Sequence, residues 1–351
     1  MILVLPCGGE SSRFPGLRPK WLLTQPNGNL MVCDAIKLLN LSHIDKIVLI
    51  AMRKHLVGNE DQLRQAFLDS GCQIPVSFHI LDQQTSSQPE TIASFLSTLE
   101  EDVPIFVKDC DGQFFCMPEP KNEVITADIS NLIGSETTSK SYCKSNDRLQ
   151  ITAIVEKQVI SRDFCVGGYS FASSRSFLRS YEQLRNFENL YVSHVIEHMM
   201  LHENIVFTSK SCNQYEDWGT NKSWQRYKKT FATIFLDIDG VIFKNASQYF
   251  HPMWGEGEPL QKNIDFIKRL KETQRVQLIL TTSRSSNFAE ITERQMKNFG
   301  IKYDNILYNM QHSQRIIVND YSKSNPYKSC DAVNVKRDSE DLEDFLSFII
   351  S

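Results

Sequence analysis

The sequence predicts an α/β protein with two domains. Short apolar runs rich in Val, Ile and Leu alternate along the chain with longer amphipathic stretches, which is typical of parallel strands joined by helices. Two of the runs end directly in an unusual polar turn, at the position where an open α/β sheet carries its site. The length of 351 residues also favours two domains, since a domain commonly has about 150 residues.

The apolar runs define the expected strands. They are Ile2–Leu5, Lys46–Ile50, Val76–Ile80, Ile105–Val107, Ile151–Val155, Ile234–Leu236, Val276–Leu280 and Arg315–Val318. Because these runs are almost continuously apolar, we expect sheets that are covered on both faces. An apolar stripe with helical spacing is formed by Leu260, Ile264, Ile267 and Leu270. Asn287 and Glu290 have the spacing of a capping box for the helix that follows.

Composition and charge exclude several classes of protein. The chain has 38 basic and 42 acidic residues, a net charge of −4, whereas a general polyanion binder would be basic, so nucleic acid is not an expected partner. The apolar run at Met1–Pro6 is too short for a signal sequence or a membrane span, so we expect a cytoplasmic protein without membrane insertion. The nine cysteines include no Cys-x-x-Cys pair, which favours reduced, partly buried thiols.

A polar and basic stretch marks the expected domain junction. The segment Asn221–Thr230 reads NKSWQRYKKT and lies shortly before the second polar turn. We therefore expect one domain over residues 1–228 and a second, smaller domain over residues 229–351.

The first polar turn follows the strand at Met1–Pro6 and reads CGGESSRF over residues 7–14. Its small residues and backbone N–H groups let phosphate oxygens approach the main chain closely. Arg13 and Lys20 add positive charge nearby. The turn by itself fits a phosphate-binding loop and a purely structural glycine turn equally well.

Further residues in order make the first half resemble the sugar-phosphate nucleotidyltransferases. That family has a glycine-rich loop, then Ser/Thr-Arg-Phe, then Pro-Lys, and the matching residues here are Gly8, Gly9, Ser12, Arg13, Phe14, Pro19 and Lys20. Ser11 departs from the pattern, because the family usually has a second glycine there. The resemblance covers about residues 1–225 and implies a GT-A-like, Rossmann-like mixed sheet.

The resemblance also implies nucleotide-binding residues. The segment Gln88–Thr91 matches the one that lines the nucleobase and ribose, which assigns Glu90 and Thr91 to nucleotide binding. Asp111 follows an expected strand and matches the carboxylate that holds Mg²⁺ against the α-phosphate. Asp109 either assists Asp111 or is a solvated neighbour.

Later segments resemble the sugar side of the family's site. Glu156 and Lys157 match a Glu-Lys pair that contacts the sugar and its phosphate. Gly168 lies in a match to the strand beneath the sugar. Asp217 matches the second Mg²⁺ ligand, with a turn-capping aspartate as the alternative.

These assignments agree with the physical needs of nucleotidyl transfer. Asp111 and Asp217 can share a Mg²⁺ ion that also grips the α-phosphate. Arg13 and Lys20 would stabilise the leaving pyrophosphate, and Lys157 would position the incoming phosphate, which is itself the nucleophile.

The second polar turn follows the strand at Ile234–Leu236 and reads DIDG from Asp237. A carboxylate at a strand end can attack a phosphoryl group, and a second one two residues later can protonate the leaving oxygen and then activate water. The stretch resembles the Asp-x-Asp-Gly motif of the haloacid dehalogenase (HAD) superfamily of phosphatases. This resemblance implies a small Rossmann-like domain with Asp237 as nucleophile and Mg²⁺ ligand and Asp239 as acid and base.

Three later residues extend the HAD resemblance. Thr282 matches the hydroxyl that bonds the phosphoryl oxygen, with Thr281 as the alternative. Arg315 is either the phosphate-binding cation or an ordinary cation at the start of a strand. Asp320 follows that expected strand and matches a Mg²⁺-binding acid.

The spacing of the HAD-like residues indicates an open site. The intervals from Asp237 to Thr282 and from Thr282 to Asp320 are too short for a cap domain as well as a crossover helix, so a capless phosphatase is expected. The segment Tyr249–Pro259 is either a small flap over the site or an ordinary surface loop.

Together the two resemblances predict a bifunctional enzyme. One half transfers a nucleoside monophosphate from an NTP, with CTP favoured although no residue decides it, to a sugar or polyol phosphate. The other is a Mg²⁺-dependent phosphomonoesterase, and both would serve the synthesis of capsular or other surface polysaccharide precursors. In the alternative, only one half is catalytic and the other is a nucleotide-sugar sensing or binding module. The sequence leaves a homo-oligomer open.

One histidine pair falls outside these motifs. His194 and His198 stand four residues apart on an expected helix but lack the glutamate that follows the first histidine in zinc proteases. We interpret them as residues of a helix face.

Overall fold

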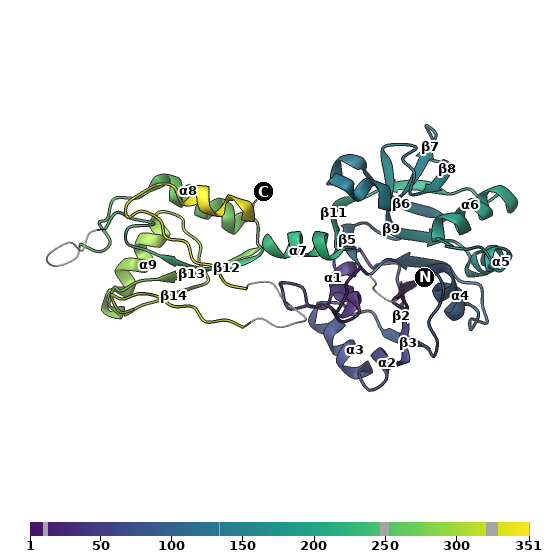
Figure 1. Cartoon of the computed structure of the whole chain (residues 1–351), viewed down its shortest axis with the longest axis horizontal. Coiled ribbons are helices and arrows are strands. Elements are labelled where there is room, and N and C mark those ends of the chain that lie inside the picture. The colour runs from purple at the N-terminus through teal and green to yellow at the C-terminus, as the bar shows by residue number, and fades with distance from the viewer. Residues whose placement is uncertain (10–12, 133, 246–252, 321–328, 351) are drawn as a thin grey trace. The chain divides into compact units, whose positions relative to one another are not determined.

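A computed structural model describes residues 1–9, 13–132, 134–245, 253–320 and 329–350. The chain divides into two compact units, Met1–Ser223 and Trp224–Ser351, and each is described by itself (Figure 1). The division falls inside helix α7 (Asn221–Lys229), which occupies the segment expected as the junction. No helix among the described residues is long and apolar enough to span a membrane.

The first unit is built on a mixed sheet with the strand order β10-β6-β9-β4-β1-β2-β3. Its strands are β1 (Ile2–Pro6), β2 (Lys46–Met52), β3 (Val76–Leu81), β4 (Ile105–Lys108), β6 (Glu123–Asp128), β9 (Asp163–Phe171) and β10 (Thr208–Ser211). Strands β7 (Ser141–Ser145) and β8 (Ile151–Glu156) extend it through β7, which pairs with β9. The strands expected in this half are confirmed, and β9 makes the sheet mixed because it runs antiparallel to β4 and β6.

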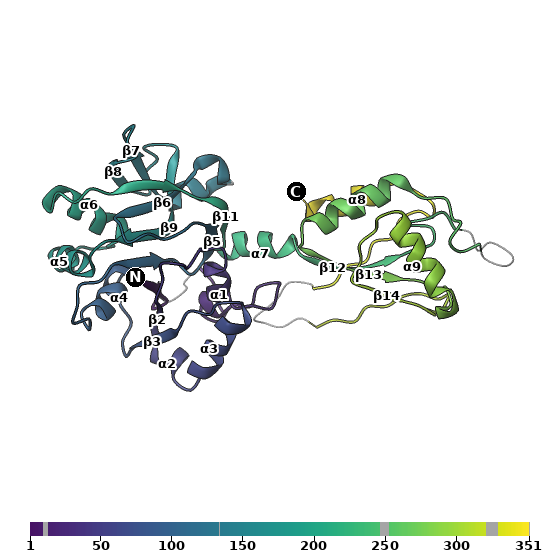
Figure 2. The same ribbon diagram turned by 180° about the vertical axis from the view of Figure 1, so that it is seen from behind.

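Helices cover both faces of this sheet (Figure 2). Alternate strand residues point to opposite faces, so Leu3 and Leu5 join one apolar cluster and Val4 joins the other. The first cluster includes residues of α1 (Met31–Ile36) and α3 (Glu60–Asp69). The second includes residues of α4 (Gln88–Leu96), α5 (Ser174–Leu184) and α6 (Val192–His202). Shorter helices are η1 (Lys20–Leu22), α2 (Arg53–Leu56), η2 (Ile129–Asn131) and η3 (Gly134–Ser139).

A separate two-stranded ribbon closes the first unit. Strand β11 (Asn213–Asp217) pairs antiparallel with β5 (Gly112–Phe115), and Asp217 stands opposite Gly112 in the register. Segments that are about a hundred residues apart in sequence therefore meet beside the end of β4.

The second unit contains a three-stranded parallel sheet in the order β12-β13-β14. The strands are β12 (Ala232–Asp237), β13 (Val276–Thr281) and β14 (Asn305–Leu307). The helices are α8 (Gln261–Glu272), η4 (Ser286–Phe288), α9 (Ala289–Asn298), α10 (Leu342–Leu346) and η5 (Ser347–Ile349). The predicted apolar stripe on α8 is confirmed, because Ile264, Ile267 and Leu270 belong to the core cluster and Leu260 is buried at its N-cap.

The predicted strand Arg315–Val318 is wrong. These residues form no strand, and Ile316 and Val318 are 76% and 90% exposed. A strand needs a partner for its backbone N–H and C=O groups, and the described part of β12 pairs with β13 alone. Runs of three apolar residues do form strands at Ile105–Val107 and Ile234–Leu236, where a neighbouring strand pairs with them, so the apolar run at 316–318 did not by itself specify sheet pairing.

Two other expectations for the second half fail. Phe288 rather than Asn287 is the N-cap of α9 and makes no side-chain cap, while Ser285 caps the preceding η4 by accepting a bond from the Asn287 N–H. The sheet is also not covered on both faces among the described residues. Leu236 is buried in the core, but the side chain of Phe235 points to the opposite face and is 51% exposed.

Candidate functional site

A cavity of about 440 Å³ opens at the carboxyl ends of β1 and β4. Its walls come from the turn after β1, from η1, from the start of α4 and from the turn after β4. Its lining residues include Cys7, Gly9, Arg13, Lys20, Thr91 and Asp111. Because β1 and β4 are adjacent parallel strands, their following turns share one edge of the sheet.

Asp111 stands in this cavity between two cations. The Lys20 ammonium lies 2.5 Å from its Oδ2 atom, and the Arg13 guanidinium lies 3.7 Å from the same atom. Burial by itself would raise the pKa of Asp111, but Lys20 and Arg13 outweigh it and hold that pKa below the ordinary value. In the same way, Asp111 outweighs the effect of burial on Lys20 and raises the pKa of that ammonium group. The carboxylate is therefore kept charged, as a metal ligand must be.

Asp217 is brought to the same place by the β5–β11 ribbon. The backbone N–H of Trp218 donates to the backbone carbonyl oxygen of Asp111, and this bond ties the two turns together. A Cβ atom at Gly219 would lie 3.2 Å from Oδ2 of Asp111 and 3.3 Å from Oδ1 of Asp217. The two predicted carboxylates thus flank a single point, although more than a hundred residues separate them in sequence.

Lys140 is a residue of this site that the sequence analysis missed. Its ammonium group donates to Oδ1 of Asp217 at 2.6 Å and to the Tyr215 hydroxyl at 3.0 Å. The Tyr215 hydroxyl itself donates to the same Asp217 oxygen at 3.1 Å. Nothing near Lys140 in the sequence signals this contact, because the partner lies in a strand far along the chain.

A buried lysine supports the turn that carries Asp111. Lys108 is inaccessible to solvent, and its ammonium group donates to the carbonyl oxygens of Asp109 and Gly112 at 2.6 and 2.8 Å. Burial lowers the pKa of Lys108. The Lys108 side chain therefore binds the backbone of the turn both before and after Asp111.

Asp109 lies in the cavity wall and is bonded within the protein. The Gln88 amide donates to its Oδ1 at 2.5 Å. Gly167 has a φ of +79°, and a Cβ there would lie 2.4 Å from Oδ2 of Asp109, so only glycine leaves room for this carboxylate. Burial, with added repulsion from Asp111, raises the pKa of Asp109.

The predicted nucleotide-binding residues have different surroundings. Gly8 packs so closely that a Cβ would lie 2.7 Å from Leu81 and 3.1 Å from the Thr91 hydroxyl. Gly9 and Thr91 line the cavity. The carboxylate of Glu90 accepts a bond from the Ser86 N–H before α4, so it helps to cap that helix. Ser12 lies outside the described residues.

The predicted sugar-side residues lie around β8, β9 and the start of α6. Glu156 accepts bonds from the hydroxyls of Ser141 and Ser193, the latter at 2.8 Å. Lys157 donates to the Tyr191 hydroxyl and lies 4.4 Å from the centre of that ring. A Cβ at Gly168 would meet Phe114 at 2.6 Å, so packing alone accounts for a glycine there. Their roles toward a sugar stay predictions.

In the second unit, Asp237 is the last residue of β12, and Asp239 stands in the turn that follows. The Arg315 guanidinium lies 3.3 Å from Oδ1 of Asp237. Burial raises the pKa of Asp237, and Arg315 opposes this shift. Arg315 is therefore next to the predicted nucleophile, although the strand on which it was expected does not form.

Arg284 is the second residue that sequence reasoning missed. Its guanidinium group, 1% exposed, donates through Nε and Nη2 to the two carboxylate oxygens of Asp239 at 2.9 and 2.7 Å. Its Nη1 atom donates to Thr292 and Gln295 of α9. The position of Arg284, two residues after the expected Thr282, was a sequence signal for a residue near the site. Its burial then requires a carboxylate partner, which is Asp239.

Thr282 and Thr281 are both buried at the end of β13. The hydroxyl of Thr282 accepts a bond from the Arg284 N–H at 3.0 Å and lies 3.5 Å from Oδ2 of Asp239. Thr281 is opposite Asp237 in the β12–β13 register. The geometry thus supports Thr282 as the hydroxyl that faces the second carboxylate.

Asp320 is exposed and follows no strand, so its predicted presentation at a strand end is wrong. Its backbone carbonyl accepts a bond from the Ser329 hydroxyl. Among the described residues, no group of three or more His, Cys, Asp or Glu side chains is arranged to hold a metal ion. The role of Asp320 as a Mg²⁺ ligand stays a prediction.

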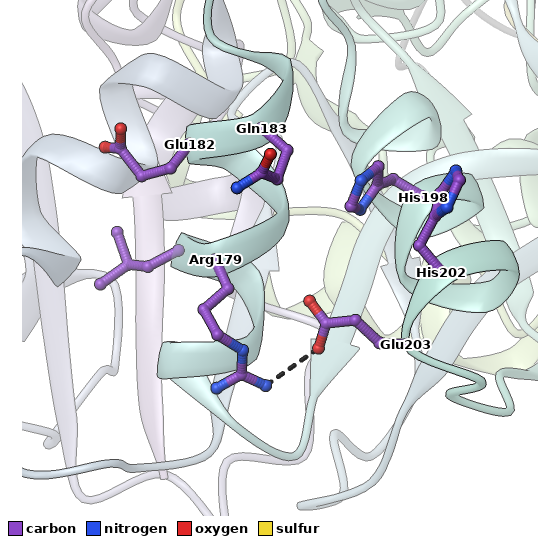
Figure 3. A pocket seen from close by; sticks show the side chains of 7 residues that line it. Arg179, Glu182, Gln183, His198, His202 and Glu203 are labelled. Atoms are coloured by element: carbon purple, nitrogen blue, oxygen red, sulfur yellow. Dashed lines mark hydrogen bonds and ion pairs between the residues drawn. The ribbon is translucent and has the colours of Figure 1, made fainter.

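A second and more open cavity of about 870 Å³ lies between α5 and α6 (Figure 3). His198 and His202 face it from α6, and Arg179 forms an ion pair with Glu203 at 2.9 Å across it. The Nδ1 atom of His198 is 3.0 Å from the Ser180 hydroxyl on α5, whereas His194 accepts a bond from the Tyr191 N–H at the start of its own helix. Both predicted helix-face histidines therefore make local structural contacts.

No protein-family model and no curated protein matches the chain. Several solved structures are similar to part of the chain. A nucleoside-diphosphate-sugar pyrophosphorylase from Vibrio cholerae RC9 is similar with a TM-score of 0.55 at 16% identity, over 65% of this chain and 99% of that one. A putative glucose-1-phosphate thymidylyltransferase from Bacillus anthracis, in complex with a sucrose, has a TM-score of 0.50 at 17% identity, over 65% and 93%. A UDP-glucose pyrophosphorylase complexed with UDP-glucose has a TM-score of 0.50 at 11% identity, over 65% and 96%.

Because these identities are low, the likeness is one of fold. About two-thirds of the chain has the mixed α/β fold of these proteins, which confirms the large mixed sheet expected for the first half. The HAD-like character of the second unit stays a prediction.

Proposed function

We propose that the first unit transfers a nucleoside monophosphate from an NTP to a sugar or polyol phosphate and releases pyrophosphate. The observation that carries the proposal is the meeting of Asp111 and Asp217 at one point, with Arg13 and Lys20 beside Asp111 in a cavity of about 440 Å³. These four residues come from separate segments of the chain, and together they supply the cations and carboxylates that binding a triphosphate with its metal ion requires. The fold shared with the solved sugar-nucleotide enzymes supports the same reading.

The donor set suits Mg²⁺. Two carboxylates with oxygen atoms facing one point are the ligands that this ion prefers, and phosphate oxygens and water complete its shell. Both carboxylates are kept close to ammonium groups, Asp111 by Lys20 and Asp217 by Lys140, so the site balances its negative charge before substrate arrives. When bound, the ion would neutralise the α-phosphate and polarise it for attack.

The protein's own groups supply orientation and charge. Arg13 and Lys20 stabilise the charge that develops on the leaving pyrophosphate. Lys157 positions the incoming sugar or polyol phosphate, which attacks without a protein base. Thr91 and Gly9 line the nucleotide side of the cavity, and the close contact of Gly8 with Thr91 fixes that wall. Cytidine as the base and a polysaccharide precursor as the product belong to the proposal on resemblance alone.

For the second unit we infer a phosphomonoesterase with Asp237 as nucleophile. Its carboxylate ends a parallel strand, and Arg315 and Asp239 lie beside it. Arg315 would hold the phosphoryl group during attack. Asp239 would protonate the leaving oxygen once its ion pair with Arg284 opens, because a proton and a bidentate guanidinium compete for the same oxygen atoms.

A second candidate function has a specific observation in its favour. Asp320 is exposed and outside any strand, and Asp239 is held by Arg284. Both features favour a chain in which only the first unit is catalytic and the second binds a phosphorylated ligand.

The experiment is a pyrophosphate-release assay with pooled NTPs and a panel of sugar and polyol phosphates, read also by product mass. We expect release that requires Mg²⁺ and is lost in Asp111→Asn. The matched control is Asp147→Asn, which changes an exposed carboxylate in the turn after β7. Silence of the unaltered protein across the whole panel would sink the transferase proposal.

A further inference from the structure

Two cysteine side chains meet beside the candidate nucleotide cavity. The Sγ atoms of Cys7 and Cys110 lie 3.0 Å apart. Both side chains are nearly buried, with exposed fractions of 5% and 4%, and both line the cavity that holds Lys20 and Asp111. The transferase chemistry derived above uses neither thiol.

The sheet register explains why these two residues meet. β1 and β4 are parallel neighbours, with Ile2 opposite Ile105 and Val4 opposite Val107. Continuing this register by three residues pairs Cys7 with Cys110. Adjacent strands lie about 4.8 Å apart, which falls within the Cα separation of about 4.4–6.8 Å found across disulfides. The register continued in this way would give the backbone the spacing that a covalent bridge needs, and the 3.0 Å between the two sulfur atoms agrees with it.

The remaining described thiols lack this combination of features. Cys143 and Cys165 are buried in the sheet and are not among the residues that line the cavity. Cys330 is exposed. Of the described cysteines that line the cavity, Cys7 and Cys110 are the two in contact.

We propose that Cys7 and Cys110 form a dithiol site that a small peroxide oxidises to an intramolecular disulfide. In the first step one thiol sulfur attacks hydrogen peroxide, the O–O bond breaks, and a sulfenic acid and one water form. In the second step the other thiol attacks that sulfur and displaces a second water. Two thiols lose two electrons and two hydrogens, and the peroxide takes up both.

The bridge would change the geometry of the cavity. Joining the sulfur atoms shortens their separation from 3.0 Å to about 2.0 Å, and the turns that carry Gly8 and Asp111 must follow. A displacement of about 1 Å in a catalytic group can lower a rate by about 100-fold. This part of the inference rests on the proposed nucleotidyl transfer, whereas the disulfide itself does not.

The chemical test maps the disulfide and needs no substrate. The full chain in the Cys330→Ser background is incubated with hydrogen peroxide for a prolonged period, because burial raises the pKa of Cys7 and leaves little reactive thiolate. Unreacted thiols are then blocked, and the protein is digested without reductant. We expect a linked peptide pair containing Cys7 and Cys110, a loss of two titratable thiols, and reversal by dithiothreitol.

Matched variants separate this site from general oxidation. Cys110→Ser should lose the linked peptide and keep its seven remaining thiols titratable, while Cys72→Ser, which changes a buried cysteine outside the cavity, should still form the bridge. A folded protein in which Cys7 and Cys110 stay reduced, or in which each ends as a separate oxidised acid, overturns the proposal.

The functional arm uses pyrophosphate release by the same samples. A mapped disulfide together with a reversible fall of about 100-fold in transfer supports both parts of the inference. If the disulfide is mapped but the oxidised and reduced proteins transfer equally well, the proposed effect on the cavity is contradicted. The proposed dithiol site itself is still supported. Absence of transfer even in reduced protein speaks against the proposed function, not against the disulfide.

Discussion

The two candidate sites differ in how completely the fold assembles them. In the first unit, both acidic residues expected to bind metal meet at one point, and each has a lysine within 2.6 Å. In the second unit, Asp237 and Asp239 are in place, but Asp320 is exposed and follows no strand.

The sheets account for this difference. The first site stands at the carboxyl ends of strands in a large sheet with helices on both faces, and a ribbon ties together the turns that carry Asp111 and Asp217. The second site stands at the end of a three-stranded sheet. Among the described residues, one face of this sheet leaves Phe235 exposed. Backbone pairing of a buried strand fixes the position of the turn that follows it. Site residues are therefore held in place before substrate binds when every turn that contains them follows such a strand.

The largest expected effect separates the two sites by paired substitutions. Asp111→Asn should lower pyrophosphate release by at least about 100-fold, because under the proposed function it removes a charged metal ligand, and should leave phosphate release unchanged. Asp237→Asn should abolish phosphate release and spare transfer, because an amide is no nucleophile. Both activities are measured on one preparation, with Asp147→Asn as the control. If both fall together in a folded protein, the two-site comparison is broken.

The buried arginine of the second site offers the next largest effect. Arg284→Met should lower the free energy of unfolding of the second unit by about 3 kcal/mol, because Asp239 would keep its charge without a partner. Arg284→Lys should lose less, since it retains the charge but not the two-pronged contact. Urea unfolding measures both, and Arg294→Met on the exposed side of α9 is the control. Equal stability of all three variants would show that the ion pair is dispensable.

The buried lysine of the first site should give a smaller change. Lys108→Met leaves the carbonyl oxygens of Asp109 and Gly112 without their donor, which should lower the free energy of unfolding by about 2 kcal/mol. The fall in transfer should appear in kcat more than in the KM for nucleotide, because the turn positions Asp111. Lys144→Met, at an exposed position of β7, is the matched control. A change in stability with unaltered kcat would restrict Lys108 to a structural role.

The smallest expected effect concerns pH and an ion cluster away from both sites. Hydrogen bonds from Lys121 and then Lys210 lower the pKa of Glu119 to about 2, below its ordinary value of 4.5. Folding therefore favours the charged carboxylate, so its contribution to stability is fully present above pH 4.5 and is lost as the pH falls toward 2. In urea unfolding, Glu119→Gln should be less stable than the unaltered protein at pH 6, and the difference should vanish near the acid limit. A constant difference at every pH would contradict this.

Much of the fold follows from the local pattern of residues. Every expected strand of the first half forms, because a run such as Lys46–Ile50 is long and apolar enough to lie buried between two sheet neighbours. The pattern fails at Arg315–Val318, where three apolar residues are exposed instead of paired. Strand formation depends on an available partner edge, which a short run does not specify.

The candidate sites divide along the same line. Asp111, Asp217, Asp237 and Asp239 are recognisable from the turns in which they stand. Lys140 and Arg284 were not predicted as site residues, because the role of each depends on a partner that is distant in sequence: Asp217 for Lys140 and Asp239 for Arg284. Arg284 had a local signal in its position after Thr282, whereas Lys140 had none.

The sequence by itself determined the α/β class, the strands of the first half and the turns that carry the carboxylates, because those features depend on local periodicity and residue type. Tertiary structure alone decided that Asp111 and Asp217 flank one point, that Lys140 and Lys108 support them, and that Cys7 meets Cys110. The physical reason is that these contacts arise from strand order and register, which depend on the packing of the whole unit and not on any short stretch of residues.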